Sequence, residues 1–367
     1  MTSRWETTLK NELDWWQKKY SIPEFGTLYE RVISNDERAP LEIISTMNKI
    51  NEVSEQRKQQ LLITLYSYIG FTAVEREYVS LKEASQTVPL NELLNQLNGL
   101  VGLQDVKAQI NRLIAFQKVQ QMRQANGLAT DNGTKHMAFL GNPGTAKTTV
   151  ARIVGRMYKS LGLLSKGHFI EASRTDLIAE YQGQTATKAR KLIERAKGGV
   201  LFIDEAYSLT ENTSSDSYGR ESLTELTKAL EDYRDDLVVI VAGYPDLMKD
   251  FFRSNPGLKS RFNTFITFPN YTVDELLQIF QLQLDNNDYK VDDGTLSYLK
   301  EEISKQLTKD SEKTFANGRY IRNVFESGVL AQSQRLFESV DEASVNDLMT
   351  LTTDDIREAV KKQFEIV

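Results

Sequence analysis

The chain contains no cysteine, and this absence excludes disulfide bonds and metal sites built from thiolates. Its only two histidines, His136 and His168, argue against a metal site built from imidazole rings. No apolar run approaches the roughly 18 residues that a membrane-spanning helix needs, and residues 1–6 lack the apolar core of a signal peptide. We therefore expect a cytoplasmic protein without a membrane span.

Positive charge is not in excess either. The 45 lysine and arginine residues face 51 aspartate and glutamate residues, so the formal net charge is −6. Proteins that bind nucleic acid usually need a basic surface, so this balance argues against nucleic acid as the main partner. With 367 residues and 40% hydrophobic content, the chain is long and apolar enough for two or three globular domains.

Residues 1–90 have the periodicity of helices and carry no catalytic pattern. All three tryptophans, Trp5, Trp15 and Trp16, lie here, and together with Leu9 and Leu13 they predict an apolar stripe at helical spacing. The stripe indicates a small helical domain that buries its own aromatic side chains. A docking surface for a partner is the alternative, because Trp and Tyr dominate interface hot spots. The sequence leaves both interpretations open.

From His136 onward, short apolar runs alternate with helical patterns, which predicts a parallel sheet covered by helices on both faces. After Thr272 the sequence predicts no further strand. Thr272 and Glu275 have the spacing of a capping box that opens a helix, and the remainder of the chain has helical patterns. The predicted strands are Met137–Leu140, Gly167–Ile170, Val200–Ile203, Leu237–Val241 and Phe265–Phe268.

The strongest motif follows the first of these strands. It is the run Gly141-Asn142-Pro143-Gly144-Thr145-Ala146-Lys147-Thr148-Thr149, and a helical pattern follows it. A strand, a glycine-containing turn, Lys-Thr and a helix form a loop whose backbone N–H groups bind the phosphates of a nucleotide. Lys147 would then reach the β- and γ-phosphates, and the Thr148 hydroxyl would bind Mg²⁺. The pattern expects glycine before the lysine, so Ala146 adds a methyl group that would weaken binding or slow turnover.

A second motif consists of Asp204 and Glu205, which follow the predicted strand Val200–Ile203. Acids in this place lie at the carboxyl edge of the sheet, where open α/β folds bind ligands. Because adjacent strand residues point to opposite sides, we expect different roles for the two acids. Asp204 would hold Mg²⁺ through water, and Glu205 would polarise the attacking water.

Together with further strings, these motifs give the chain a resemblance to AAA+ ATPases of the CbxX/CfqX family. That family includes red-type rubisco activase (CbbX), stage V sporulation protein K and the EccA ATPases of type VII secretion. The resemblance covers residues 95–335. The strings that carry it are Gly141-Asn142-Pro143-Gly144-Thr145, Gly199-Val200-Leu201-Phe202-Ile203-Asp204-Glu205-Ala206-Tyr207-Ser208-Leu209, Ala242-Gly243-Tyr244, Asn255-Pro256-Gly257-Leu258, Ser260-Arg261-Phe262 and Asn317-Gly318-Arg319-Tyr320-Ile321-Arg322-Asn323.

The resemblance implies three domains and further site residues. Residues 1–90 would form an N-terminal helical domain, 91–270 the α/β AAA+ nucleotide-binding domain, and 271–367 a helical lid. Arg261 matches the arginine finger, which reaches into the site of a neighbouring subunit and stabilises charge on the transferred phosphoryl group. The other matched positions are Val101 and Gly102 in the adenine pocket, Arg319 as the lid sensor with Arg322 as its competitor, Tyr244 as the nearest polar group to sensor 1, Tyr181 on the first pore loop, and 211–217 at the second pore loop.

The function that the resemblance implies is a ring-forming ATPase, a hexamer, with ATP and Mg²⁺ as cofactors. Lys147, Glu205, Arg261 and Arg319 would be its catalytic residues. Hydrolysis would move Tyr181 against a protein client in a central pore, and residues 1–90 would select the client or an adaptor. The alternative, which Ala146 motivates, is a nucleotide-dependent assembly scaffold with weak hydrolysis, for example in a type VII secretion-like system.

Overall fold

The computed structural model describes residues 4–33, 39–50, 53–69, 88–130, 133–179, 184–210, 217–309, 315–337 and 343–365. The chain divides into two compact units, Met1–Gln86 and Thr87–Val367. Among the described residues, no helix is long and apolar enough to cross a membrane.

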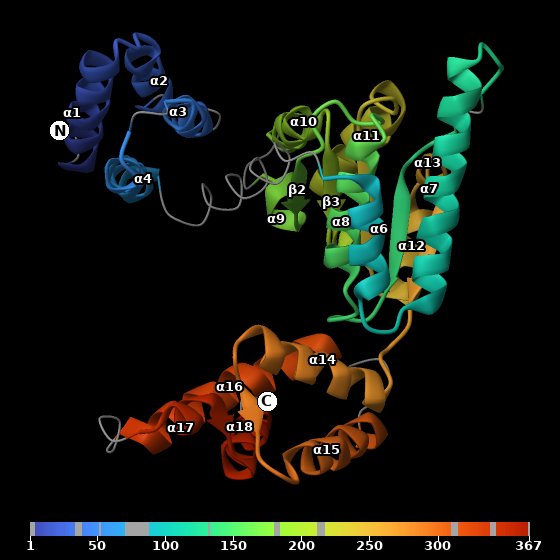
Figure 1. Cartoon of the computed structure of the whole chain (residues 1–367). Coiled ribbons are helices and arrows are strands. Elements are labelled where there is room, and N and C mark those ends of the chain that lie inside the picture. Colours follow the sequence, from blue (N-terminus) through green and yellow to red (C-terminus); the bar gives the residue numbers. More distant parts are fainter. Residues whose placement is uncertain are drawn as a thin grey trace. The chain divides into compact units, whose positions relative to one another are not determined.

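The described part of the first unit contains four helices, α1 (Arg4–Tyr20), α2 (Glu24–Ile33), α3 (Ala39–Asn48) and α4 (Glu55–Ile69) (Figure 1). Its core includes Leu9, Leu13 and Trp16, all buried. The prediction that Trp15 belongs to the same stripe was wrong, because Trp15 is 39% exposed. Adjacent helix residues point about 100° apart, so Trp15 faces outward, where the Arg57 guanidinium lies 3.9 Å from its ring centroid. The side chain of Trp5 lies outside the described residues.

The second unit is built on a five-stranded parallel sheet, as predicted. Its strands are β1 (Met137–Gly141), β2 (Phe169–Ala172), β3 (Val200–Ile203), β4 (Val238–Gly243) and β5 (Thr264–Phe268), in the spatial order β2-β3-β4-β1-β5. The second strand begins at Phe169, two residues after its predicted start at Gly167. Every strand pair in this sheet is parallel, with Phe139 of β1 between Ala242 of β4 and Ile266 of β5.

Two apolar cores lie against the two faces of this sheet. In β1, Met137 and Phe139 belong to one core and Ala138 to the other, as the alternation of a strand requires. Helices α6 (Leu90–Gly99), α7 (Gln104–Ala125) and α8 (Lys147–Ser160) contribute to the first core. Helices α10 (Thr185–Ala196), α11 (Ser217–Asp232), α12 (Pro245–Ser254) and α13 (Pro256–Arg261) contribute to the second. The short helices α9 (Arg174–Leu177) and η1 (Ala206–Leu209) follow β2 and β3.

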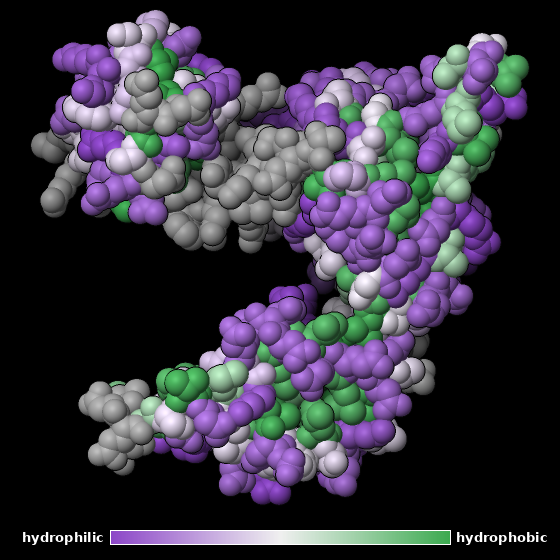
Figure 2. All heavy atoms as spheres, viewed as in Figure 1, coloured by the Kyte–Doolittle hydropathy of each residue, from purple (hydrophilic) through white to green (hydrophobic). Residues whose placement is uncertain are grey.

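One part of α7 leaves apolar side chains uncovered. Phe116, Val119 and Met122 are exposed at three-residue intervals along this helix. Figure 2 shows apolar colour along the outer part of α7.

The lid follows the sheet domain. It contains α14 (Val273–Asn286), α15 (Thr295–Lys309), α16 (Gly318–Leu336), α17 (Val345–Met349) and α18 (Thr353–Glu365). Thr272 and Glu275 form the predicted capping box at the start of α14. The prediction that strands cease after Thr272 was wrong, because β6 (Lys290–Val291) pairs with β7 (Thr350–Leu351). Two residues are too few to give the alternating pattern that identifies a strand in a sequence.

Candidate nucleotide-binding site

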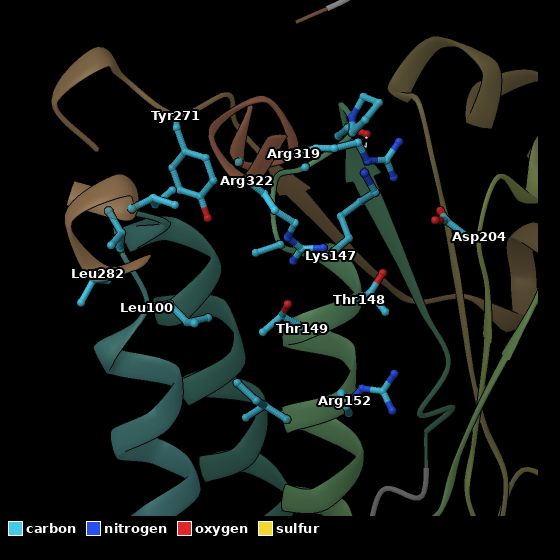
Figure 3. A pocket seen from close by; sticks show the side chains of 18 of the residues that line it. Leu100, Lys147, Thr148, Thr149, Arg152, Asp204, Tyr271, Leu282, Arg319 and Arg322 are labelled. Atoms are coloured by element: carbon cyan, nitrogen blue, oxygen red, sulfur yellow. Dashed lines mark hydrogen bonds between the residues drawn. The ribbon is translucent and has the colours of Figure 1, made fainter. Parts of the chain in front are cut away.

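A cavity of about 820 Å³ lies where β1, β3 and β4 end (Figure 3). It is lined by the loop between β1 and α8, by α8 itself, by the residues at the ends of β3 and β4, by the end of α6 and the residues that follow it, by one face of α14, and by the start of α16. Its lining side chains include five cations, Lys147, Arg152, Arg156, Arg319 and Arg322, and two carboxylates, Asp204 and Glu205. This excess of positive charge suits a polyanion.

The loop after β1 has the backbone of a phosphate-binding turn. Strand β1 ends at Gly141 and α8 begins at Lys147, so the first free N–H groups of α8 lie at the cavity. Ala146 has φ 67° and ψ 20°, a left-handed conformation that favours glycine. The structure thus gives a reason for the glycine that the sequence pattern expects: the requirement lies in the backbone as well as in the space beside a phosphate.

Lys147 is buried at the first turn of α8. Its Nζ donates to the carbonyl oxygens of Gly141, at 2.9 Å, and Asn142, at 2.7 Å. Burial lowers the pKa of Lys147, and the negative charge of Asp204 partly opposes this shift. A phosphate group beside Nζ would favour the charged form of the lysine.

The two acids after β3 differ from the prediction in one respect. We expected them to point to opposite sides because adjacent strand residues do so, but β3 ends at Ile203 and both acids line the same cavity. Glu205 has φ 48°, a left-handed conformation that a non-glycine residue adopts at a cost of ~1–3 kcal/mol. The Glu205 N–H donates to Asp204 Oδ1 at 3.0 Å. This strained turn brings both carboxylates to one site.

Both candidate sensor arginines of the lid line the cavity. Arg319 and Arg322 lie near Lys147 in Figure 3. The positive charge of Arg319 contributes to lowering the pKa of Lys147. Tyr244 also lines the cavity, at the end of β4, and its ring lies 5.9 Å from that of Tyr207.

Several predicted residues do not line the cavity. Of the two residues predicted for the adenine pocket, Val101 lines the cavity, whereas Gly102 lies against the Glu275 carboxylate. Asn142 and Thr145 stabilise the phosphate-binding turn instead. The Asn142 side chain donates to Asn270 Oδ1 at 2.9 Å, and Thr145 Oγ1 donates to the Asn142 carbonyl at 2.8 Å. The other predicted residues that line it are Gly141, Pro143, Gly144, Ala146, Lys147, Thr148, Thr149, Asp204 and Glu205.

Arg261 lies away from the cavity of its own chain. Its guanidinium donates to the Gly257 carbonyl at 2.9 Å and lies 3.5 Å from a Glu231 carboxylate oxygen. Tyr181 and residues 211–216, on the two predicted pore loops, lie outside the described residues.

The structure adds polar residues that the sequence analysis missed, and two of them stand out. Arg156 on α8 and Gln283 on α14 line the cavity, and their buried Nε and Oε1 atoms have no hydrogen-bond partner among the described residues. Apolar side chains lie near them in the lining, namely Leu100, Val101, Ile153, Ile279 and Leu282. An apolar slot with one donor and one acceptor can hold a flat heterocycle such as a nucleobase. No local motif marks these residues, since the fold brings α8 and α14 together.

The cavity combines a phosphate-binding loop, two acids after a buried strand and arginines on a helical lid. This combination is typical of an AAA-type ATPase. Residues 137–270 match the model of the ATPase family associated with various cellular activities (AAA), and residues 272–366 match that of the AAA lid domain. The chain belongs to the CbxX/CfqX family of AAA+ ATPases, because relatives of that family are about 40% identical to it over most of their length.

Three of these relatives illustrate the similarity. The chain is 41% identical to stage V sporulation protein K of Bacillus subtilis, over 73% of this chain and 82% of the relative. It is 41% identical to protein CbbX of Cereibacter sphaeroides, over 72% and 86%. It is 38% identical to the chloroplastic ribulose bisphosphate carboxylase/oxygenase activase of Cyanidioschyzon merolae, over 77% and 96%. The chain is therefore an ATPase of this family.

Proposed function

We propose that this ATPase works as a ring, a hexamer, and uses ATP hydrolysis to remodel a protein client. The observation that carries the proposal is the position of Arg261. The cavity has its own lysine, acids and lid arginines, but Arg261 lies outside it, beside Glu231. An arginine that serves the same site from a neighbouring subunit would explain this separation, and hydrolysis would then require assembly.

Within one subunit, the cavity residues divide the work by their chemistry. Lys147 and Arg319 would neutralise the developing charge of the γ-phosphoryl group, and Arg322, which also lines the cavity, is the competing lid arginine. Thr148 and Asp204 would hold Mg²⁺, which neutralises phosphate charge when it is bound. Glu205 would orient and polarise the attacking water. Tyr244 stays a proposal for sensor 1.

The protein client is proposed from the relatives. The name of the Cyanidioschyzon relative says that it activates ribulose bisphosphate carboxylase/oxygenase, which is itself a protein. By analogy we propose a protein client here, gripped by Tyr181 and selected by the first unit, with the cytoplasm as the setting. The exposed side chains of Trp15 and Ile63 give the first unit apolar surface for such a contact.

A mixing experiment tests the ring. We expect Arg261→Ala, Lys147→Ala and Glu205→Gln each to abolish hydrolysis by the pure variant. When Arg261→Ala and Lys147→Ala subunits are mixed equally, an intact site of one can receive the intact arginine of the other. Random mixing should then restore hydrolysis at about a quarter of all sites. No recovery in mixed rings of normal size would refute the trans role of Arg261.

A second candidate function is a nucleotide-dependent scaffold that assembles and recruits partners but hydrolyses weakly, for example in a type VII secretion-like system. Ala146 favours it, because its methyl group lines the cavity beside Lys147, where it can crowd a bound phosphate. ATPase rates of wild type and Glu205→Gln, with and without a candidate client, separate the two functions. Equal, near-zero rates in both proteins would support the scaffold.

A further inference from the structure

The residue directly before α16, Asn317, has an unusual backbone and an unusual side-chain environment. Asn317 is fully buried and has φ 48° and ψ −126°, a backbone conformation that is unfavourable for a residue with a side chain. Asparagine before a helix ordinarily caps it through its side chain, but the Asn317 side chain makes no cap hydrogen bond to α16. Both the strain and the side chain must therefore serve something else.

The Asn317 amide joins three segments. Its Nδ2 shares two hydrogens among three acceptors, the Phe315 carbonyl oxygen at 2.9 Å, Asn270 Oδ1 at 3.0 Å and the Pro143 carbonyl oxygen at 3.3 Å. Its Oδ1 accepts from the Tyr271 N–H at 3.0 Å. Pro143 belongs to the phosphate-binding loop, and Asn270 and Tyr271 form the connection from β5 to the lid. One buried side chain thus ties the loop, the connection and the start of α16.

The phosphate-binding loop makes two more contacts with the same segments. Asn142 Nδ2 donates to Asn270 Oδ1 at 2.9 Å, so this oxygen accepts from two asparagines. The Gly318 N–H donates to the Gly144 carbonyl at 3.1 Å. A Cβ atom on Gly144 would lie 2.7 Å from the Arg319 nitrogen, so the two backbones are in direct contact. A movement of the loop must therefore displace the start of α16 as well.

We propose that Asn142, Asn270 and Asn317 form a latch through which the phosphate-binding loop sets the position of the lid. Asn317 is the positioning residue of this latch. It holds the start of α16, and with it Arg319 two residues later, against the loop that receives the phosphates. When the loop adjusts to a nucleotide, the latch passes the change to the lid. This inference rests on the proposed nucleotide-dependent function and names the side chains that couple site and lid.

The hydrogen-bond directions make a chemical test possible. Position 317 must donate, because three carbonyl-type oxygens face its Nδ2. At position 270, the bonds from Asn142 and Asn317 are both accepted by Oδ1. An Asn317→Asp side chain has the same shape, but it would present oxygen to oxygen. An Asn270→Asp side chain keeps both acceptor contacts. Asn323→Asp is the matched control, since Asn323 on the same helix donates to Gln363 Oε1 within the lid.

The experiment measures lid movement and turnover in the full chain. Because the sequence has no cysteine, Lys118→Cys on α7 and Lys361→Cys on α18, both exposed, allow specific labelling for energy transfer. We expect ADP to change the transfer efficiency in the wild-type background, in Asn270→Asp and in Asn323→Asp, and to change it little in Asn317→Asp. We also expect kcat to fall by about 10- to 100-fold in Asn317→Asp, because small misplacements of catalytic groups have effects of this size. The KM for ATP should change much less.

Three results would overturn the latch. The first is a normal ADP response and normal kcat in Asn317→Asp. The second is equal damage from Asn323→Asp, which would indicate a general loss of stability of α16. The third is loss of the ADP response in Asn270→Asp as severe as in Asn317→Asp. If wild type binds ADP but does not hydrolyse ATP, the proposed motor function fails while the ADP response still tests the latch.

Discussion

Replacement of Ala146 by glycine separates two effects of a single methyl group. The first is backbone strain, since Ala146 has φ 67° and ψ 20°. For a residue with a Cβ atom the left-handed conformation costs ~1–2 kcal/mol. The second is contact with a phosphate, since Ala146 also lines the cavity. Strain lowers the stability of the nucleotide-free protein, whereas a steric clash with phosphate lowers only the affinity for nucleotide.

Three contributions set the expected change in the free energy of unfolding of the Ala146→Gly variant. Relief of the left-handed strain stabilises the glycine variant by ~1–2 kcal/mol. The greater freedom of glycine in the unfolded chain opposes this by ~0.4–1 kcal/mol. Loss of the half-buried methyl group removes ~0.4 kcal/mol, half of a fully buried carbon. The expected net change in the free energy of unfolding is therefore small, about 0 to 1 kcal/mol, which corresponds to a rise in Tm of at most ~2–4 °C.

The assays are thermal unfolding without nucleotide, calorimetric binding of ADP, and ATP turnover. Because Ala146 already has the conformation that glycine would adopt, we expect the loop N–H groups to keep their directions. The Kd for ADP should then change less than about threefold and kcat less than about tenfold. A gain in kcat of about 100-fold with an unchanged Tm would refute this reasoning. It would show that the methyl group obstructs catalysis, and it would favour the scaffold function.

Three further predictions concern other parts of the chain. Burial lowers the pKa of His136 to about 4, so between about pH 6.5 and pH 4 the unfolded chain binds a proton that the folded chain does not. Urea unfolding should therefore show that the free energy of unfolding decreases by up to ~3 kcal/mol as the pH falls through this range, and His136→Asn should reduce the decrease. Gln283→Leu should reduce the preference for ADP over IDP by about five- to tenfold in calorimetry, because its free Oε1 can accept from the amino group of adenine but not from a 6-oxo group. Trp16→Ala should destabilise the first unit by ~3–5 kcal/mol in chemical unfolding, whereas the exposed Trp15 should cost far less.

Each of these predictions has its own control. Gln281→Leu, on the exposed side of α14, should leave the ADP-to-IDP ratio unchanged, and an equal drop there would exclude a specific role of Gln283. A pH profile that His136→Asn leaves unaltered would place the acid sensitivity elsewhere. Equal destabilisation by the two tryptophan substitutions would contradict the orientation of α1.

Much of the site could be predicted from the sequence because its parts are local. Gly141, Lys147 and Thr148 stand within one strand–turn–helix unit, and Asp204 and Glu205 directly follow a buried strand. In a parallel sheet, the carboxyl ends of all strands meet at one edge. Local patterns therefore sufficed to predict that these residues come together, and the comparisons confirm the family and the fold class.

Other features depend on contacts between segments far apart in the chain, and only the tertiary structure decided them. Arg156 and Gln283 share a cavity because α14 packs beside the sheet domain, and Asn317 meets Pro143 across 174 residues. The left-handed turn at Glu205 and the outward position of Trp15 likewise became known only from the structure. Hydrogen bonds and burial across such distances leave no periodic pattern in a sequence, because their partners are selected by the fold as a whole.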